Sequence, residues 1–345
     1  MKILNFFYEN PPKFELSFER KVQIPFGKNV LIKGVKHCGK KKLILNFLSN
    51  FKPEEILFLD LKDLRFEKDS LKNLKTFLKQ NPQIKILCLY NLDFTPNLDF
   101  VSIPMILSTD KKNIVLPDFM ELELDYPDFE EFISISKKNL PVNHLVGLFL
   151  QSGRSIFREN EVLRKNFTFL ELEILKYLAI NLGNQISTAK LFTTLKSKIK
   201  TSKDSVYQSI KDLENSFIIH SVFHDEKKLR KIYFRDFALK NALCIQKDFK
   251  HLFENLILNE LFKLKQDFFY NKFFHFYSKT SKTAYISSPT LDIDLIKLRA
   301  KKILPKALEL GIFHIFFITL SSEESFFEQG VKFEVLCFDK WALGF

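Results

Sequence analysis

Residues 29–50 read NVLIKGVKHCGKKKLILNFLSN, and this stretch decides the fold class of the first part of the chain. A short apolar run ends at Gly34, a polar loop follows, and the apolar positions after Lys40 repeat at helical spacing. The segment from Gly34 to Lys40 matches GxxxxGK, between a strand and a helix as a phosphate-binding P-loop requires. Backbone N–H groups of such a loop and the start of its helix surround phosphates. The sequence therefore predicts a P-loop, with ATP or ADP as its ligand.

This loop departs from the P-loop pattern at one position. Lys40 is expected to reach the β and γ phosphates, and the residue after it is normally a Ser or Thr whose hydroxyl ligates Mg²⁺. Here that residue is Lys41, and an ammonium group cannot ligate a cation. A phosphate cradle can survive this change, but Mg²⁺ binding is compromised, so we predict no metal site. The predicted nucleotide-binding residues are Gly34, Val35, Lys36, His37, Cys38, Gly39, Lys40 and Lys41.

Apolar strands and helices alternate through residues 1–135. Four more apolar runs read as strands, at 56–61, 84–90, 104–109 and 115–124. The lysine-rich segment 68–80 reads as a helix. Continuous apolar strands separated by helices indicate a parallel sheet that is covered on both faces. The predicted fold class is therefore α/β, with a P-loop NTPase domain over residues 1–135.

The strand expected to carry catalytic carboxylates lacks them. ILCLYNLDF has Tyr90 and Asn91 where a P-loop ATPase has Asp and then often Glu. Asp93 lies two residues further on and is better explained as part of a polar turn. Without those carboxylates the site lacks support for a metal and a group that orients the attacking water. We therefore predict weak hydrolysis or none.

Residues 136–245 are predicted to form a helical linker and a winged helix-turn-helix. Helices at 169–183, 187–198 and 201–216 precede two strand-like runs around a charged turn. The third helix could enter a major groove while the two strand-like runs and their charged turn, together called the wing, contact phosphates. A docking module between the first and last domains is an equally open alternative. The candidate nucleic-acid contacts are Lys203, Gln208 and Lys211 on the helix and Lys227, Lys228, Arg230 and Lys231 on the wing.

The order of these segments resembles the bacterial and archaeal AAA-superfamily ATPases that carry a winged helix and a C-terminal nuclease-like domain. The matching stretches are LIKGVKHCGKKKLILNFL, LFLDLKDLRF, MILSTD, ELELDYPDFEEF, LENSFIIHSVF, KIYFRD and LFENLILNEL. The resemblance implies that Ser108 and Thr109 stand where that family places a polar sensor near the γ-phosphate. Its departures, at Lys41, Tyr90 and Asn91, fall on positions that the family needs for hydrolysis.

The same resemblance implies a small restriction-endonuclease-like α/β domain over residues 246–345. The active site of that fold combines a helix Glu, a strand Asp and an E-x-K sequence, whose carboxylates hold Mg²⁺. Glu254 fits the helix position, but the strand TAYIS has no carboxylate. Asp292 and Asp294, in a run at 291–296 that reads as a strand, lack the E-x-K spacing. We therefore expect an inactive remnant made of Glu254, Asp292 and Asp294.

The composition is typical of a soluble globular protein. Of 345 residues, 46% are hydrophobic and 27% are charged, and the net charge of +12 suits a polyanionic ligand or partner. The four cysteines form no CxxC pair, so neither a zinc site nor a disulfide framework is predicted. The first residues lack the pattern of a secretory signal and no apolar run reaches about 18 residues, so we expect no such signal, a cytoplasmic protein and no membrane partner.

Three functions remain open at this point. The first, which the loop favours, is an ATPase-like switch or scaffold that binds nucleotide and hydrolyses it slowly or not at all. The second is a nucleic-acid-binding protein that uses the winged helix and the basic tail. The third is a metal-dependent nuclease. The expected partners are therefore a nucleotide and either DNA or another protein.

Overall fold

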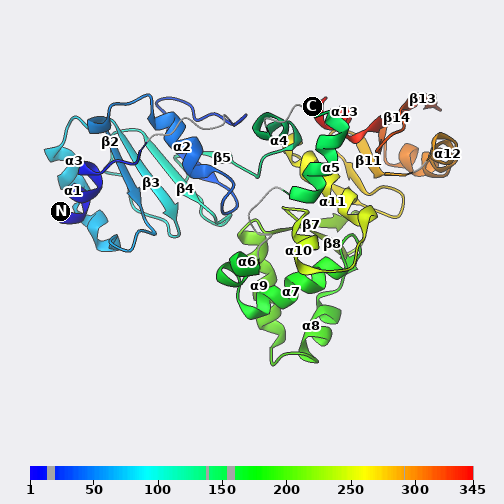
Figure 1. The fold of residues 1–345 in the computed structure, drawn as a ribbon, viewed down its shortest axis with the longest axis horizontal. Helices are drawn as coiled ribbons and strands as arrows, with labels where there is room; N and C mark the ends of the chain where they lie inside the picture. The colour runs from blue at the N-terminus through cyan, green and yellow to red at the C-terminus, as the bar shows by residue number, and fades with distance from the viewer. Residues whose placement is uncertain (14–19, 137–139, 154–159, 291, 345) are drawn as a thin grey trace. The chain divides into compact units, whose positions relative to one another are not determined.

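The computed structural model describes residues 1–13, 20–136, 140–153, 160–290 and 292–344 (Figure 1). Its contacts divide the chain into two compact units. The first comprises Met1–Pro127 with Asn215–Phe217, and the second comprises Asp128–Glu214 with Ile218–Phe345. The predicted division into three domains, with boundaries after residues 135 and 245, stays a prediction.

In the described part of the first unit, five strands form one parallel sheet in the order β2–β3–β4–β1–β5. The strands are β1 (Val30–Lys33), β2 (Ile56–Asp60), β3 (Ile86–Leu92), β4 (Met105–Thr109) and β5 (Met120–Glu123). The helices are α1 (Lys2–Glu9), α2 (Lys40–Leu48) and α3 (Leu74–Gln80), with 3₁₀ turns at Pro53–Glu55 and Lys68–Asn73. This confirms the predicted α/β class with a parallel sheet.

The core on one face of this sheet joins it to α1 and α3. Alternate strand residues point to the same face, and here they are large aliphatic side chains. The buried cluster contains Leu4, Phe7, Leu57, Leu59, Leu74, Phe77, Leu87, Leu89 and Leu107. The continuous apolar runs of the sequence therefore become interior strands.

Two predicted elements of this unit are shorter in the structure. The helix expected over 68–80 is α-helical only from Leu74, because the Asp, Ser and Asn before it favour tighter local turns. The strand expected over 115–124 is paired only at Met120–Glu123. Pro117 has no N–H for a strand ladder, and the N–H of Phe119 donates to the Leu116 carbonyl in a turn instead.

The strand β1 lies where the chain changes direction across the sheet. β1 connects through α2 to β2 at one edge, whereas its neighbour β4 connects to β5 at the opposite edge. In open parallel sheets, ligands bind outside the carboxyl ends of the strands at such a switch point. Lys33 and Thr109, the last residues of β1 and β4, are paired in register. The GxxxxGK loop begins directly after this pair.

In the described part of the second unit, nine strands form one mixed sheet in the order β13–β14–β12–β11–β10–β9–β7–β8–β6. The strands are β6 (Gln185–Ile186), β7 (Ile219–His224), β8 (Arg230–Phe234), β9 (Phe269–Tyr270), β10 (Phe276–Ser278), β11 (Thr283–Ser287), β12 (His314–Thr319), β13 (Glu324–Glu328) and β14 (Val331–Cys337). The hairpin of the predicted wing, β7 and β8, is interior to this sheet, because β7 also pairs with β9 and β8 also pairs with β6.

The helices of the second unit begin near their predicted starts in the middle of the chain. They are α4 (Phe129–Ser136), α5 (Val142–Ser152), α6 (Asn160–Asn166), α7 (Phe169–Ile180), α8 (Thr188–Lys196), α9 (Lys203–Asn215), α10 (Leu239–Leu243), α11 (Phe249–Leu261), α12 (Ile293–Glu309) and α13 (Phe338–Leu343), with a 3₁₀ turn at Phe262–Leu264. Thr168 caps α7 in a capping box with Glu171, and Ser187 caps α8. Figure 1 shows α6 to α9 gathered beside β7 and β8.

The strand predicted over 291–296 is wrong. α12 begins at Ile293, because Oδ1 of Asp292 accepts a hydrogen bond from the N–H of Leu295 at 2.9 Å and caps the helix. The domain types predicted for residues 136–245 and 246–345 stay predictions. No described helix combines the length and the apolar character that a bilayer crossing requires.

Candidate nucleotide-binding site

The loop from Gly34 to Gly39 turns β1 into α2, and both glycines are required by its geometry. A Cβ on Gly34 would lie 2.0 Å from the carbonyl oxygen of Leu124, so the close approach of that backbone excludes any side chain. Gly39 has φ of 99° and ψ of 12°, a left-handed conformation that glycine adopts without steric cost. His37, with φ of 62°, is also left-handed. The loop therefore makes a sharp turn directly before the helix.

The amino end of α2 has the features of an anion site. No described side chain caps it, and its first turn contains no acidic residue. The first N–H groups of a helix have no partner within the helix, and the helix dipole gives this end a partial positive charge. Within the loop, the N–H groups of Val35 and Gly39 donate to no described residue. Backbone donors are therefore available to a phosphate.

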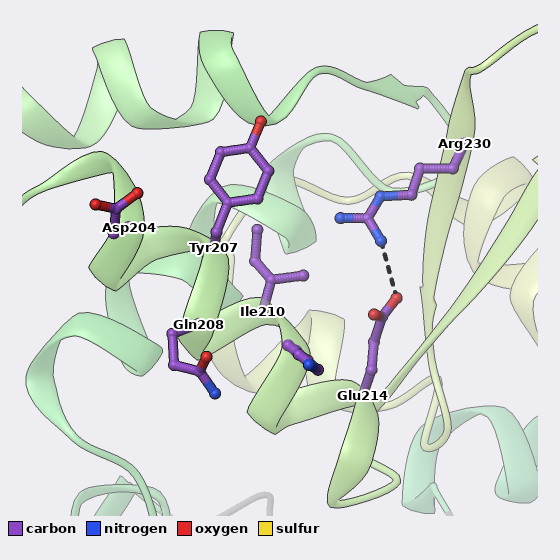
Figure 2. Close-up of a pocket in the computed structure, with 7 residues that line it drawn as sticks. Asp204, Tyr207, Gln208, Ile210, Glu214 and Arg230 are labelled. Carbon is purple, nitrogen blue, oxygen red and sulfur yellow. Dashed lines mark hydrogen bonds and ion pairs between the residues drawn. The ribbon is translucent and has the colours of Figure 1, made fainter.

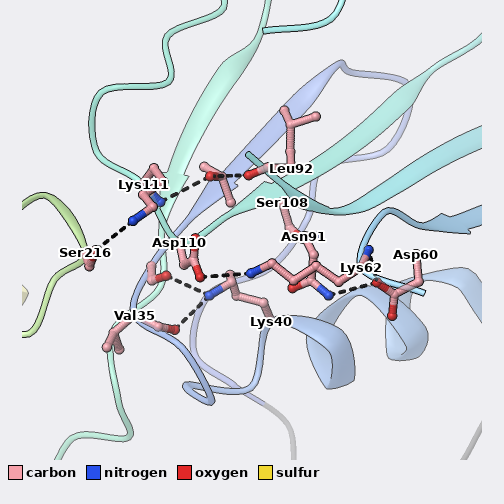
Figure 3. Close-up of polar contacts among 12 residues, drawn as sticks. Val35, Lys40, Asp60, Lys62, Asn91, Leu92, Ser108, Asp110, Lys111 and Ser216 are labelled. Atoms are coloured by element: carbon pink, nitrogen blue, oxygen red, sulfur yellow. Dashed lines mark hydrogen bonds and ion pairs between the residues drawn. The ribbon is translucent and has the colours of Figure 1, made fainter. Parts of the chain in front are cut away.

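Lys40 is the buried cation of the loop, with 5% of its surface exposed. Its ammonium donates to the carbonyl oxygens of Gly34 at 2.6 Å and Val35 at 2.7 Å (Figure 3). Among the described residues, no carboxylate forms an ion pair with it. Burial lowers the pKa of Lys40; the nearby groups of Cys38 and Asp110 oppose this effect, and the charges of Lys62 and Lys36 reinforce it. The two carbonyls satisfy its hydrogen bonds without neutralising its charge.

The outside of the loop is tied to the chain that follows β5. Arg20 donates to the carbonyl of Cys38 at 2.6 Å and to that of Asp125 at 2.9 Å. The hydroxyl of Tyr126 donates to the carbonyl of Lys36 at 3.2 Å. The thiol of Cys38 donates to the Leu124 carbonyl at 3.2 Å. These bonds use the carbonyl groups and the thiol of the loop, so they hold its shape without occupying its N–H groups.

Polar side chains also meet at the carboxyl ends of β2, β3 and β4. Asn91 has φ of 64°, and its Nδ2 donates to Oδ1 of Asp60 at 2.8 Å while its N–H donates to Oγ of Ser108 at 3.3 Å. The hydroxyl of Thr109 donates to the carbonyl of Leu92 at 2.7 Å. Ser108 and Thr109 are fully buried and join β3 to β4. Their sensor-like role stays a prediction.

An ion pair between Lys62 and Asp110 lies at the same edge of the sheet. Asp110 directly follows β4, and its Oδ2 is 3.2 Å from Nζ of Lys62, which follows β2 (Figure 3). Burial alone would raise the pKa of Asp110, but the charges of Lys62, Lys36 and Lys40 hold it below its ordinary value. Asp110 is therefore a carboxylate at neutral pH.

Neither Lys62 nor Asp110 was predicted from the sequence, and nor was Asp60. One signal could have found them. All three stand at or just after the end of an apolar strand, and the carboxyl ends of parallel strands share one edge of the sheet.

The donor groups at this edge do not suit Mg²⁺. Mg²⁺ takes oxygen ligands in near-octahedral geometry. Lys41 stands where the hydroxyl is needed, with its ammonium 5.8 Å from the centre of the Tyr90 ring. Burial raises the pKa of Tyr90 to about 12, so its phenol stays protonated. Asp60 and Asp110 are engaged by Asn91 and Lys62. In the described parts of the chain, no three His, Cys, Asp or Glu side chains could hold a metal ion together.

The residues predicted to contact nucleic acid divide into exposed and paired groups. Five are exposed: Lys203, Gln208, Lys211, Lys227 and Lys228. Arg230 forms an ion pair with Glu214 at 3.1 Å (Figure 2). Lys231 forms one with Glu254 at 3.0 Å, and only 13% of the Lys231 side chain is exposed. Two of the four wing cations are therefore neutralised within the fold.

One face of α9 and the start of β8 line an open hollow of about 430 Å³ (Figure 2). Its lining consists of Asp204, Tyr207, Gln208, Ile210, Lys211, Glu214 and Arg230. A surface that binds the phosphate backbone presents an excess of cations. This lining has two cations and two carboxylates, so it offers no such excess.

The three residues of the predicted nuclease remnant have separate contacts. Glu254, buried in α11, accepts from the hydroxyl of Tyr233 and the ammonium of Lys231. Asp292 caps α12, and Asp294 is exposed in its first turn. Each side chain thus has a local explanation, and their catalytic ancestry stays a prediction.

No family model matches the chain, and no curated protein matches it in sequence. Several solved structures are similar to it. A Walker-type ATPase of Pyrococcus abyssi has a TM-score of 0.42 and 13% identity, over 62% of this chain and 90% of that one. The ORC1 protein of Aeropyrum pernix in complex with DNA has a TM-score of 0.36 and 12% identity, over 63% and 86%. A signal-transduction ATPase of Pyrococcus horikoshii with a tetratricopeptide repeat sensor has a TM-score of 0.27 and 14% identity, over 82% and 50%. These scores assign no family to the chain.

Proposed function

We propose that the protein binds the phosphate groups of ATP or ADP at the GxxxxGK loop, as an AAA-type ATPase-like protein with degenerate catalytic motifs. The observation that carries this proposal is the buried ammonium of Lys40, whose hydrogen bonds go to backbone carbonyls and not to a carboxylate. A buried charge is costly unless it is paired. A phosphate at the amino end of α2 would supply the missing negative charge.

The bound nucleotide acts as a switch in this proposal. Phosphate binding would draw the Lys40 ammonium away from the carbonyls of Gly34 and Val35. Gly34 lies against the backbone at Leu124, so a change in the loop is passed to the segment after β5. Nucleotide occupancy would thereby change the shape of one edge of the unit.

Hydrolysis is expected to be slow or absent. Tyr90 and Asn91 supply no carboxylate, and Asp60 and Asp110, at the strand ends beside the loop, are held by Asn91 and Lys62. A group that activates water must be able to accept its proton. We expect turnover far below the ~1 s⁻¹ lower end of typical enzymes. Robust Mg²⁺-dependent ATPase activity that disappears in Lys40→Ala would contradict this part of the proposal.

Binding itself is tested by thermal unfolding with and without ATP or ADP. At a nucleotide concentration about 100 times Kd, the free energy of unfolding should rise by about 2.7 kcal/mol. Lys40→Ala should abolish this gain. Lys42→Ala is the matched control, because Lys42 is exposed in the same helical turn and should leave the gain unchanged. Equal stabilisation of Lys40→Ala and the wild type would remove the basis for the proposal.

A second candidate function is nucleic-acid binding through the second unit. The observation in its favour is a run of exposed lysines at the turn between α8 and α9. They are Lys196, Lys198, Lys200 and Lys203. Together with Lys227 and Lys228 they could contact phosphates of a duplex without base-specific readout. Fluorescence anisotropy with a mixed-sequence duplex tests this candidate, and an absence of binding at low salt would favour the docking alternative.

A further inference from the structure

We propose that the loop takes nucleotide phosphates without a divalent cation, and that the ammonium of Lys62 supplies the positive charge that Mg²⁺ would otherwise bring. This inference depends on the proposed function, because it concerns the same site. It names the chemical class of the ligand as the metal-free polyphosphate of a nucleotide.

The backbone of Lys62 is set by a chain of polar contacts between neighbouring strands. Oδ1 of Asp60 accepts from the N–H of Lys62 at 3.2 Å and from Nδ2 of Asn91 at 2.8 Å. Asn91 stands where a P-loop ATPase carries a catalytic carboxylate. In this protein the side chain of Asn91 binds the carboxylate of Asp60 instead. Asp60 also accepts from the N–H of Lys62 and so fixes the backbone turn that carries Lys62. Asn91, at a position where P-loop ATPases carry a catalytic carboxylate, thus helps to position Lys62.

The ammonium of Lys62 lies close enough to the loop to act on its charges. Asp110, with 8% of its side chain exposed, holds it at 3.2 Å, while the Lys62 side chain keeps 47% of its surface exposed. Burial is the largest cause that lowers the pKa of Lys40 and of His37, and the charge of Lys62 is a smaller one that acts in the same direction on both. Figure 3 shows Lys62 and Lys40 approaching the same strand ends. Lys62 can therefore reach toward solvent while it stays anchored beside the loop.

The local charge favours phosphate and disfavours a divalent cation. Lys36 lies in the loop, Lys40 and Lys41 begin α2, and Lys62 follows β2. The carboxylates beside them are Asp60, Asp110 and Asp125. Ammonium groups bind phosphate as point charges. The same charges repel Mg²⁺, which would also lack an oxygen ligand at Lys41. A nucleotide that arrives with Mg²⁺ must therefore lose the metal or bind less tightly.

The test is a titration of the full chain with ATP, once in EDTA and once in excess MgCl₂. NaCl is added to match the ionic strength, because salt screens exposed charges. We expect binding in EDTA to be at least as tight as binding in MgCl₂. Binding that is tighter in MgCl₂ than in EDTA, or that requires MgCl₂, overturns this inference alone. An absence of binding in both buffers contradicts the proposed function and, with it, the inference.

Two variants test whether ATP binding in EDTA depends on Lys62. Lys62→Gln should weaken ATP binding in EDTA about tenfold, because one ammonium is lost from the site. Asp110→Asn is the matched variant, since it removes the carboxylate that competes for Lys62, and it should bind ATP as tightly as the wild type or more tightly. Thermal unfolding in the absence of nucleotide checks that both variants fold. Unchanged affinity in a folded Lys62→Gln protein would refute the role of Lys62.

Discussion

Lys40 in the first unit and Lys231 in the second are both largely buried lysines, and they differ in what neutralises them. Lys40 donates to two backbone carbonyls, whereas Lys231 forms an ion pair with the buried carboxylate of Glu254 at 3.0 Å. Glu254 also accepts from the hydroxyl of Tyr233 and lies near His275. The charge of Lys231 is therefore balanced by a carboxylate in direct contact, whereas Lys40 forms no ion pair among the described residues and has only the more distant charge of Asp110.

This difference separates a structural cation from a cation that awaits a ligand. A buried charge is costly until it is paired, and removing one partner of a buried pair leaves the other uncompensated. Lys231 has its partner in the folded chain, so its contribution is to stability. Lys40 has only the more distant charge of Asp110, so it would gain a directly bound counter-charge when an anion binds. A count of basic residues cannot make this distinction, because it does not show where the carboxylates lie.

The largest expected effect is on the pair in the second unit. Glu254→Gln leaves Lys231 buried without a counter-charge, so the free energy of unfolding should fall by about 3–5 kcal/mol. Glu214→Gln is the matched control, because its partner Arg230 is more exposed and such pairs contribute about 1 kcal/mol or less. Urea unfolding measures both. Similar losses of unfolding free energy in the two variants would show that burial does not determine how much these ion pairs contribute to stability.

Acid should weaken the same cluster. Burial lowers the pKa of His275 to about 4; Glu254 opposes this effect, and Arg299, Lys231 and Lys250 reinforce it. An unfolded histidine binds its proton below a pH of about 6.5, whereas the folded one does so only near 4. The contribution of the buried, neutral His275 to the free energy of unfolding is thus complete above about pH 6.5 and is lost as the pH falls toward 4.

Urea unfolding at pH 7.5 and pH 5.0 measures this loss. The histidine should account for a fall of about 2 kcal/mol in the free energy of unfolding between these values. His275→Gln removes the titrating group, so the free energy of unfolding of this variant should fall less between the two pH values, by the amount that the histidine contributes. An identical pH dependence in the wild type and in His275→Gln would contradict the assignment.

The smallest expected effect concerns the wing. Lys227 and Lys228 are exposed, whereas Arg230 and Lys231 are paired within the fold. If the second unit binds duplex DNA, Lys227→Ala with Lys228→Ala should reduce the slope of log affinity against log salt by up to about two phosphate contacts. Arg230→Ala should change it less. Anisotropy at several salt concentrations measures the slope, and a larger change in Arg230→Ala would show that its pair with Glu214 opens on DNA.

Local sequence patterns were sufficient for the loop and for the starts of α7 and α8, but not for α3 and α12. GxxxxGK between an apolar strand and a helical repeat predicts the turn at Gly39 and the position of Lys40, because every residue involved is a chain neighbour. Thr168 and Ser187 likewise mark the starts of α7 and α8. Such features depend on hydrogen bonds between residues three or four positions apart, so the residues involved can be recognised in the sequence itself.

The remaining features depend on which strands become neighbours. Lys62 meets Asp110 because the ends of β2 and β4 share one edge of the sheet, and no local pattern encodes the strand order β2–β3–β4–β1–β5. The pairing of β7 with β9 similarly places the predicted wing inside a sheet. The neutralisation of Lys231 by Glu254 could not be predicted for the same reason. The partners of charged side chains are set by tertiary structure.

The most direct test of this account is a calorimetric titration of the chain with ADP in EDTA, on the wild type, Lys40→Ala and Glu254→Gln. The titration is done at a low temperature at which all three proteins are folded. We expect binding to the wild type and to Glu254→Gln with similar affinity, and no binding to Lys40→Ala. ADP binding to a folded Lys40→Ala protein with wild-type affinity would contradict the claim that the uncompensated charge of this lysine holds the phosphate.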